Sequence, residues 1–279
     1  MKKILLSIIA LIALGLTACD KIDSDEYIVY AGAVGTWYDD TETIPATQRV
    51  LVEKYTGCRC INCPTADEVI HTAQQRYGEQ LVALSIHPNG SNYTIPFTGE
   101  SDLRTEVGKI WNDAFGFNAY PQALLNRNGE VLVPTTNFDN HIDALLARIP
   151  QVAVAVECEP GPGDSLHIIV HVTLLTALDA ELNLTLAISE DGIITSQKMP
   201  NGSTQTDYVQ NHVLRSVITD TWGAPIDKGT DGNSSRVAHF HYKPDVSWNL
   251  SNCHIVAFVS LRDDANHSIL NVAECTIRP

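Results

Sequence analysis

Hydrophobic residues follow two different periods along this chain of 279 residues. Between about 47 and 150, short apolar runs alternate with segments whose apolar residues recur every three to four positions, which predicts alternating strands and helices. From 151 onward apolar residues recur at every second position, as in Val152, Val154 and Val156, which predicts strands with one buried face. We therefore predict an α/β domain at 47–150 and an all-β sandwich domain at 151–279.

The predicted elements of the first domain run strand, helix, strand, helix, strand, strand, helix. Their expected ranges are 50–52, 64–77, 81–86, 101–115, 123–125, 131–133 and 137–149. Strands of the second domain are expected at 152–158, 166–175, 182–188, 237–243, 253–261 and 269–277. Six or seven strands with Gly, Pro and Asn turns favour an immunoglobulin-like antiparallel sandwich. The stretch 190–210 has no clear period and is expected to cover one end of the sandwich.

Cys60 and Cys63 lie where the first predicted strand leads into the first helix. The dipole and unpaired N–H groups of a helix N-terminus favour a thiolate there. The same CxxC spacing is also compatible with half of a zinc site or with an inert structural bridge. Cys58 leaves the pairing open as well, because a Cys58–Cys63 bond would leave Cys60 free.

Residues 1–18 have the form of an export signal, with charge at Lys2 and Lys3 and an apolar segment at 4–14 that is too short to span a membrane. The segment Leu-Thr-Ala-Cys ending at Cys19 resembles the bacterial lipobox, which implies cleavage before Cys19 and lipid attachment to it. An ordinary secretory signal is the alternative. Residues 19–46 are predicted to form an acidic tether and lead-in, in which 20–26 resembles the export signal of Bacteroides-type surface lipoproteins or is a solvated linker.

The formal net charge of −15 excludes nucleic acid as a partner, since phosphate contacts need clustered Lys and Arg. His239 and His241 share one strand face, but exposed strand histidines are commoner than metal pairs. We therefore expect no metal and no cofactor, and the sequence leaves the oligomeric state open.

Three further cysteines and one serine carry expectations in the second domain. Cys253 and Cys275 face each other across a predicted hairpin, so we expect a structural disulfide between them in an oxidising compartment, with Cys158 left unpaired. Three small buried hydrophobes are the alternative. The segment Asp-Ser-Leu at 164–166 resembles the O-glycosylation motif of Bacteroides-type exported proteins, which implies a glycan on Ser165.

The order of elements in the first domain, with its CxxC, resembles that of thioredoxin. Tyr120-Pro121, just before the third strand, matches the loop that carries a cis-proline facing the CxxC in that family. The resemblance implies that Cys60 attacks, Cys63 resolves, and Pro121 helps to present backbone to a substrate disulfide. The sequence departs from the best-known thioredoxins in having Ile-Asn between the cysteines and Arg59 in place of a tryptophan before them.

The segments 207–215 and 252–259, together with Tyr-Thr-Gly at 55–57 leading into the CxxC, are similar to the Omp28-related outer-membrane lipoproteins. The resemblance implies a lipid-anchored outer-membrane protein on the cell surface, with a periplasm-facing orientation as the alternative. Two functions follow as expectations. One is thiol–disulfide exchange with a protein substrate, and the other is non-catalytic binding or adhesion with the CxxC as a structural disulfide.

Overall fold

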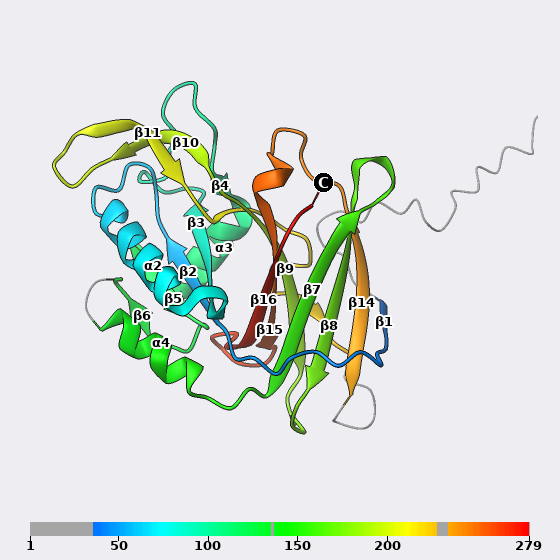
Figure 1. Cartoon of the computed structure of the whole chain (residues 1–279). Helices are drawn as coiled ribbons and strands as arrows, with labels where there is room; N and C mark the ends of the chain where they lie inside the picture. Colours follow the sequence, from blue (N-terminus) through cyan, green and yellow to red (C-terminus); the bar gives the residue numbers. More distant parts are fainter. Residues whose placement is uncertain (1–35, 135–136, 228–233, 279) are drawn as a thin grey trace, which may run out of the picture.

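The structure is a computed structural model that describes residues 36–134, 137–227 and 234–278. Strands are the main secondary structure of the described residues (Figure 1). The described α-helices all lie before residue 150, in the part called here the first half of the chain. The predicted signal peptide, Cys19 and most of the tether lie outside the described residues. No helix within the described part is long and apolar enough to cross a membrane.

The elements of the first half follow the predicted order. They are β2 (Val50–Tyr55), α2 (Cys63–Tyr77), β3 (Leu81–Pro88), β4 (Arg104–Thr105), α3 (Glu106–Phe115), β5 (Gln122–Leu125), β6 (Val131–Leu132) and α4 (Phe138–Leu146). Helix α3 begins later than the predicted 101, because Arg104 and Thr105 first pair with the end of β3. The Thr105 hydroxyl then accepts a hydrogen bond from Gly108 N (3.1 Å) and caps the helix.

The strands of the second half include every predicted one. They are β7 (Val152–Pro160), β8 (Leu166–Leu174), β9 (Leu182–Glu190), β10 (Ile193–Lys198), β11 (Thr204–Gln210), β12 (Val213–Val217), β13 (Ala224–Pro225), β14 (Ser235–Tyr242), β15 (Cys253–Leu261) and β16 (Ile269–Thr276), with β1 (Thr36–Asp39) joining them from the lead-in. The stretch 190–210, expected to be irregular, forms an antiparallel hairpin from β10 and β11.

Two sheets enclose the larger core. The four-stranded sheet has the order β1-β14-β8-β7, and the ten-stranded sheet has the main path β16-β15-β9-β12-β3-β2-β5-β6. Alternate residues of β7, β8 and β14 meet those of β9 and β15 in one apolar cluster, whose centre includes Ile168, Phe240 and Ile255. This β-rich packing agrees with the period of two in the sequence.

The larger sheet runs through both halves of the chain. Ser85 N donates to His212 O (2.7 Å) and Ser85 pairs with Val213, so β3 of the first half and β12 of the second are neighbouring parallel strands in one sheet. Helices α2 and α4 cover one face of the shared sheet through Ile70 and Ile142. Helix α3 covers the other face through Trp111, in a cluster that also contains Phe258 of β15. Strand β2 is buried along its whole length, as expected for a strand covered on both faces.

Candidate functional site

A disulfide joins Cys60 and Cys63, with their Cα atoms 5.5 Å apart. Cys63 is the first residue of α2, so the bond sits at the helix N-terminus, as the sequence predicts. The peptide bond between Tyr120 and Pro121 is cis. Gln122, the first residue of β5, lies opposite Tyr55, the last residue of β2. The buried Pro121 therefore lies at the same end of these strands as the loop that carries the disulfide.

The loop at 89–103 packs against one side of the disulfide loop. Arg59 N donates to Tyr93 O (2.8 Å), and the Arg59 side chain donates to Ile95 O (2.8 Å) and lies over the Phe97 ring. A Cβ at Gly57 would come within 2.4 Å of Tyr93 O, so this approach requires glycine. Arg59 therefore holds the 89–103 loop against the disulfide loop.

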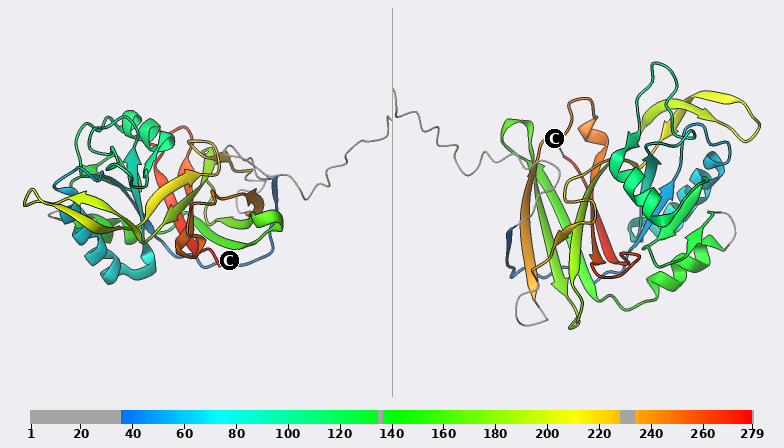
Figure 2. Two further views of the ribbon diagram at one scale, coloured as in Figure 1. Left: turned by 90° about the horizontal axis from the view of Figure 1, so that it is seen from above. Right: turned by 180° about the vertical axis from the view of Figure 1, so that it is seen from behind.

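The β10–β11 hairpin covers the disulfide loop from the second half of the chain. The Gln197 side-chain amide, itself buried, donates to Cys60 O (3.0 Å) and Gly57 O (3.3 Å). Lys198 N donates to Cys58 O (2.8 Å), and Ser196 N donates to a Glu100 carboxylate oxygen (2.7 Å). Figure 2 shows this yellow hairpin reaching across the helical side of the molecule. As a result Cys60 and Cys63 are only 2% and 0% exposed.

Cys58 is a free, buried thiol beside the bridge. Its Sγ donates to Ile95 O (3.2 Å). Burial raises the pKa of Cys58, and the neighbouring Arg59 opposes part of that shift. Of the two pairings that the sequence left open, the structure therefore has Cys60–Cys63.

A cavity of about 290 Å³ lies between α2 and strand β11 of the hairpin. Lys54 of β2 forms an ion pair there with Asp67 of α2, and Tyr208 of β11 donates to Asp67 (2.7 Å). Burial lowers the pKa of Lys54 to about 7, while the Asp67 carboxylate in contact favours the charged ammonium. Burial also raises the pKa of Tyr208 to about 12. These groups tie the hairpin to α2.

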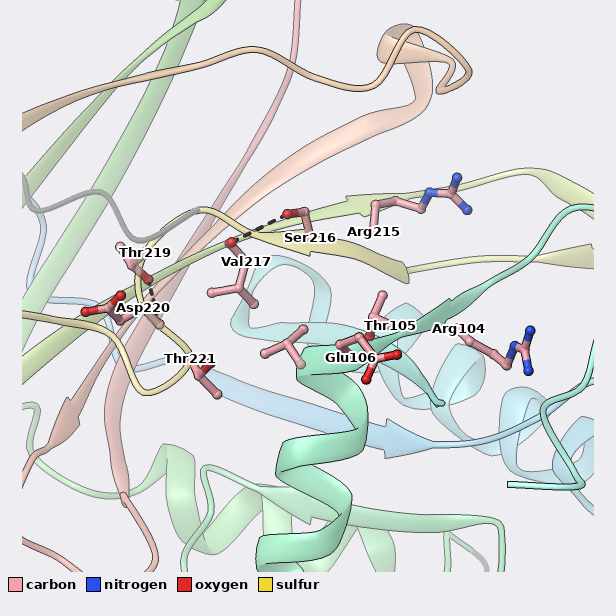
Figure 3. Close-up of a pocket in the computed structure, with 10 residues that line it drawn as sticks. Arg104, Thr105, Glu106, Arg215, Ser216, Val217, Thr219, Asp220 and Thr221 are labelled. Carbon is pink, nitrogen blue, oxygen red and sulfur yellow. Dashed lines mark hydrogen bonds between the residues drawn. The ribbon is translucent and has the colours of Figure 1, made fainter. Parts of the chain in front are cut away.

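A second cavity, of about 390 Å³, separates the start of α3 from β12. Arg104 and Arg215 extend from its two walls toward one end, and Thr219 and Asp220 lie at the other (Figure 3). Arg104 is paired with Asp102 (2.6 Å) and Arg215 with Glu190 (3.2 Å). Both cations are thus neutralised by the protein itself.

The expected disulfide between Cys253 and Cys275 is not formed, and both thiols are free. The predicted hairpin exists as β15–β16, but its register places Cys275 opposite Ile255, and a β-bulge between Val259 and Ser260 accounts for one residue of this displacement. Cys253 is fully buried two residues away on β15. Displacement along the strand is the physical reason for the correction.

Ser165 lies in the turn before β8, where its hydroxyl donates to Pro162 O (2.7 Å) and its side chain is mostly buried. Its glycosylation stays a prediction. His239 and His241 stand on the outer face of β14, and His167 of β8 stacks beside both rings. Across the described ranges, no group of three or more His, Cys, Asp or Glu side chains is arranged to hold a metal ion.

Reasoning from sequence missed Gln197, which covers the disulfide, and Lys54, which helps to tie the hairpin to α2. Neither residue belongs to a motif, and each acts on a segment far away in the chain. One weak signal was Gly57, just before the cysteines. A glycine permits the close backbone approach that Tyr93 makes there.

Comparison with solved structures shows the fold. HBP35 of Porphyromonas gingivalis matches with a TM-score of 0.66 at 18% identity, covering 84% of this chain and 76% of that one. Protein AGR_C_4864 from Agrobacterium tumefaciens matches with a TM-score of 0.51 at 17% identity, covering 84% of this chain and 97% of that one.

A domain of the outer membrane lipoprotein Omp28 from Porphyromonas gingivalis is 18% identical over 47% of this chain and 92% of that one, with a TM-score of 0.33. Among curated proteins none matches. The model of the family described as outer membrane protein Omp28 matches residues 109–279, which is more than half of the chain. The chain belongs to the Omp28 family of outer membrane proteins.

Proposed function

We propose that this protein is an outer-membrane lipoprotein, anchored through Cys19 and displayed on the cell surface, whose Cys60–Cys63 couple exchanges thiols and disulfides with protein substrates. Its first half is a thioredoxin-like module, and its second half is an immunoglobulin-like sandwich. The observation that carries the proposal is the disulfide at the N-terminus of α2, which lies at the same end of the sheet strands as cis Tyr120–Pro121.

In the oxidised state found here, the bridge accepts two electrons. A substrate thiolate attacks Cys60 Sγ, the Cys60–Cys63 bond breaks, and Cys63 leaves as a thiolate at the positive end of α2. A second substrate thiolate then attacks the mixed disulfide, which yields an oxidised substrate and two reduced cysteines. The reverse sequence reduces a substrate disulfide.

Access to Cys60 requires movement of the β10–β11 hairpin, because the Gln197 amide and the Lys198 backbone lie on the loop that carries the bridge. Ile61, between the two cysteines, is 48% exposed. Together with the exposed Tyr93 and Ile95 of the adjoining loop, it offers an apolar rim for an extended polypeptide substrate.

A second candidate function is supported by the burial of the same bridge. Cys60 and Cys63 are almost inaccessible, which suits a structural disulfide in a non-catalytic surface binding or adhesin-type protein. In that case the bridge fixes the start of α2 and does not turn over.

The reduction potential distinguishes the two functions. The mature protein is equilibrated in thiol–disulfide buffers and alkylated, and the titrating cysteines are located by mass. A Cys60–Cys63 couple between about −120 and −270 mV supports exchange, and one below about −300 mV supports a structural bridge. The Cys60→Ser variant should lose exchange with a reduced model protein, whereas Cys253→Ser, a buried control, should retain it.

A further inference from the structure

Two free thiols, Cys158 of β7 and Cys275 of β16, lie at one end of the sandwich core. Both are half-buried and pack against the same apolar cluster. Both also line one cavity of about 530 Å³, together with Glu157, Glu159 and Arg278. Cys253, the remaining free thiol of this half, does not line that cavity.

The strands that carry the two thiols close the sandwich along one side. β7 is an edge of the four-stranded sheet and β16 is an edge of the ten-stranded sheet, and the two strands run next to each other (Figure 1). Asn271 of β16 donates through its side chain to Val152 O of β7 (2.8 Å), which ties the strands at their other end. Among the described strands, none lies between Cys158 and Cys275 along this side.

Cys158 also affects the ionisation of Cys275. Burial raises the pKa of Cys275 to about 12, and the neighbouring Cys158 raises it further. By contrast, the pKa of Cys253 is raised by burial and Glu190, without a cysteine among its causes.

We propose that Cys158 and Cys275 form a dithiol that oxidises to a disulfide joining the two sheets. In the first step the Cys158 thiolate attacks a small or protein disulfide, whose own S–S bond breaks to release one thiolate. The Cys275 thiolate then attacks the mixed disulfide at Cys158, forming the intramolecular S–S bond and releasing the second thiolate. Two protons leave the protein, two electrons go to the oxidant, and the oxidant becomes two thiols.

The surroundings support a structural role for the bond. Cys158 and Cys275 both line the cavity, which gives a small oxidant access to them. Burial raises the pKa of both thiols, to about 11 for Cys158 and about 12 for Cys275. Thiols of high pKa are poor leaving groups, so the finished bridge resists reduction. It is independent of the proposed exchange at Cys60–Cys63.

The test uses the full mature chain incubated with oxidised glutathione. Free thiols are blocked with iodoacetamide under denaturing conditions, and the digest is analysed by mass before and after reduction. We expect one linked peptide pair containing Cys158 and Cys275, with Cys58 and Cys253 alkylated. Alkylation of both Cys158 and Cys275, or a stable glutathione adduct on Cys158 beside an intact Cys275, overturns the proposal.

Matched variants separate pairing from misfolding. Cys158→Ser should lose the linked peptide and leave Cys275 alkylated, whereas Cys253→Ser should keep the link. The closed loop is long, so oxidation should raise the Tm of the parent protein and of Cys253→Ser by roughly 5–10 °C and leave the Tm of Cys158→Ser unchanged. An equal rise in Cys158→Ser would assign the stabilisation to other cysteines and contradict the proposal.

Discussion

Arg127 and Glu53 form a two-pronged ion pair inside the protein, with N–O distances of 2.8 and 2.6 Å and side chains that are 1% and 0% exposed. The guanidinium also lies over the ring of Trp111 in α3 and faces that of Phe258 in β15. One cation thus connects β2, the β5–β6 turn, α3 and the sandwich. It holds the two halves together at their shared core.

Replacing Arg127 with Met should lower the free energy of unfolding by about 3–5 kcal/mol, because it leaves the Glu53 carboxylate buried without its partner. Urea titration followed by fluorescence measures this. Arg76→Met removes an exposed ion-pair cation and should leave the urea midpoint unchanged. Adding Glu53→Leu to Arg127→Met should recover part of the loss; a double variant less stable than the single one contradicts this account.

Gln197→Ala should make the Cys60–Cys63 bridge easier to reach. The substitution removes the amide's hydrogen bonds to Cys60 O and Gly57 O, each worth about 1 kcal/mol, so we expect reduction by dithiothreitol to accelerate roughly tenfold or more. Gln205→Ala lies on the same hairpin but at an exposed position and serves as the matched control. Equal rates in the parent and both variants would show that the hairpin does not limit access.

The imidazole of His87 gives the fold a pH dependence. His87 is 1% exposed and its two ring nitrogens have no hydrogen-bond partner among the described residues, and burial lowers its pKa from 6.5 to about 3. As the pH falls below 6.5, His87 is protonated in the unfolded chain but stays neutral in the folded chain. Stability is therefore lost between about pH 6.5 and 3, at about 1.4 kcal/mol per unit.

His87→Leu should abolish this contribution, so its urea midpoint should fall less than that of the parent between pH 7 and pH 5. The expected difference is about 2 kcal/mol at pH 5. His71→Leu changes an exposed histidine of α2 and is the matched control for the loss of an imidazole. Parallel curves for His87→Leu and the parent would contradict the assignment.

The Cys19→Ser variant should move the protein from the membrane fraction to the soluble fraction. This variant cannot carry the lipid proposed for residue 19, so loss of that anchor should release the protein. Fractionation and immunoblotting measure the distribution, with Cys253→Ser as a thiol-loss control that stays with the membrane. A membrane-bound Cys19→Ser protein would point to another anchor.

Much of this fold was predictable because burial leaves a period in the sequence. The strand Leu166–Leu174 and the helix Cys63–Tyr77 both show their buried faces in the sequence. The hairpin β10–β11 was not predicted, since residues such as Thr204 and Gln205 are polar and β11 has no buried apolar face. Its stability comes from partners elsewhere, including Glu100 and Asp67.

The candidate site was predictable to the extent that one short motif and one proline define it. Cys60 and Cys63 are bonded, and the bond before Pro121 is cis. The cover provided by Gln197 was not predictable, because a hydrogen bond across 137 residues leaves no local pattern. The mismatch of Cys253 and Cys275 has a similar origin, since the turn and a β-bulge together set the hairpin register and neither leaves a pattern in the sequence.

The junction between β3 and β12 has a consequence for biogenesis. Synthesis from the N-terminus delivers β3 long before residue 213, so most of one β3 edge stays open while more than a hundred further residues are added. Open strand edges promote association between chains. Truncation before β12 should therefore yield an aggregating fragment.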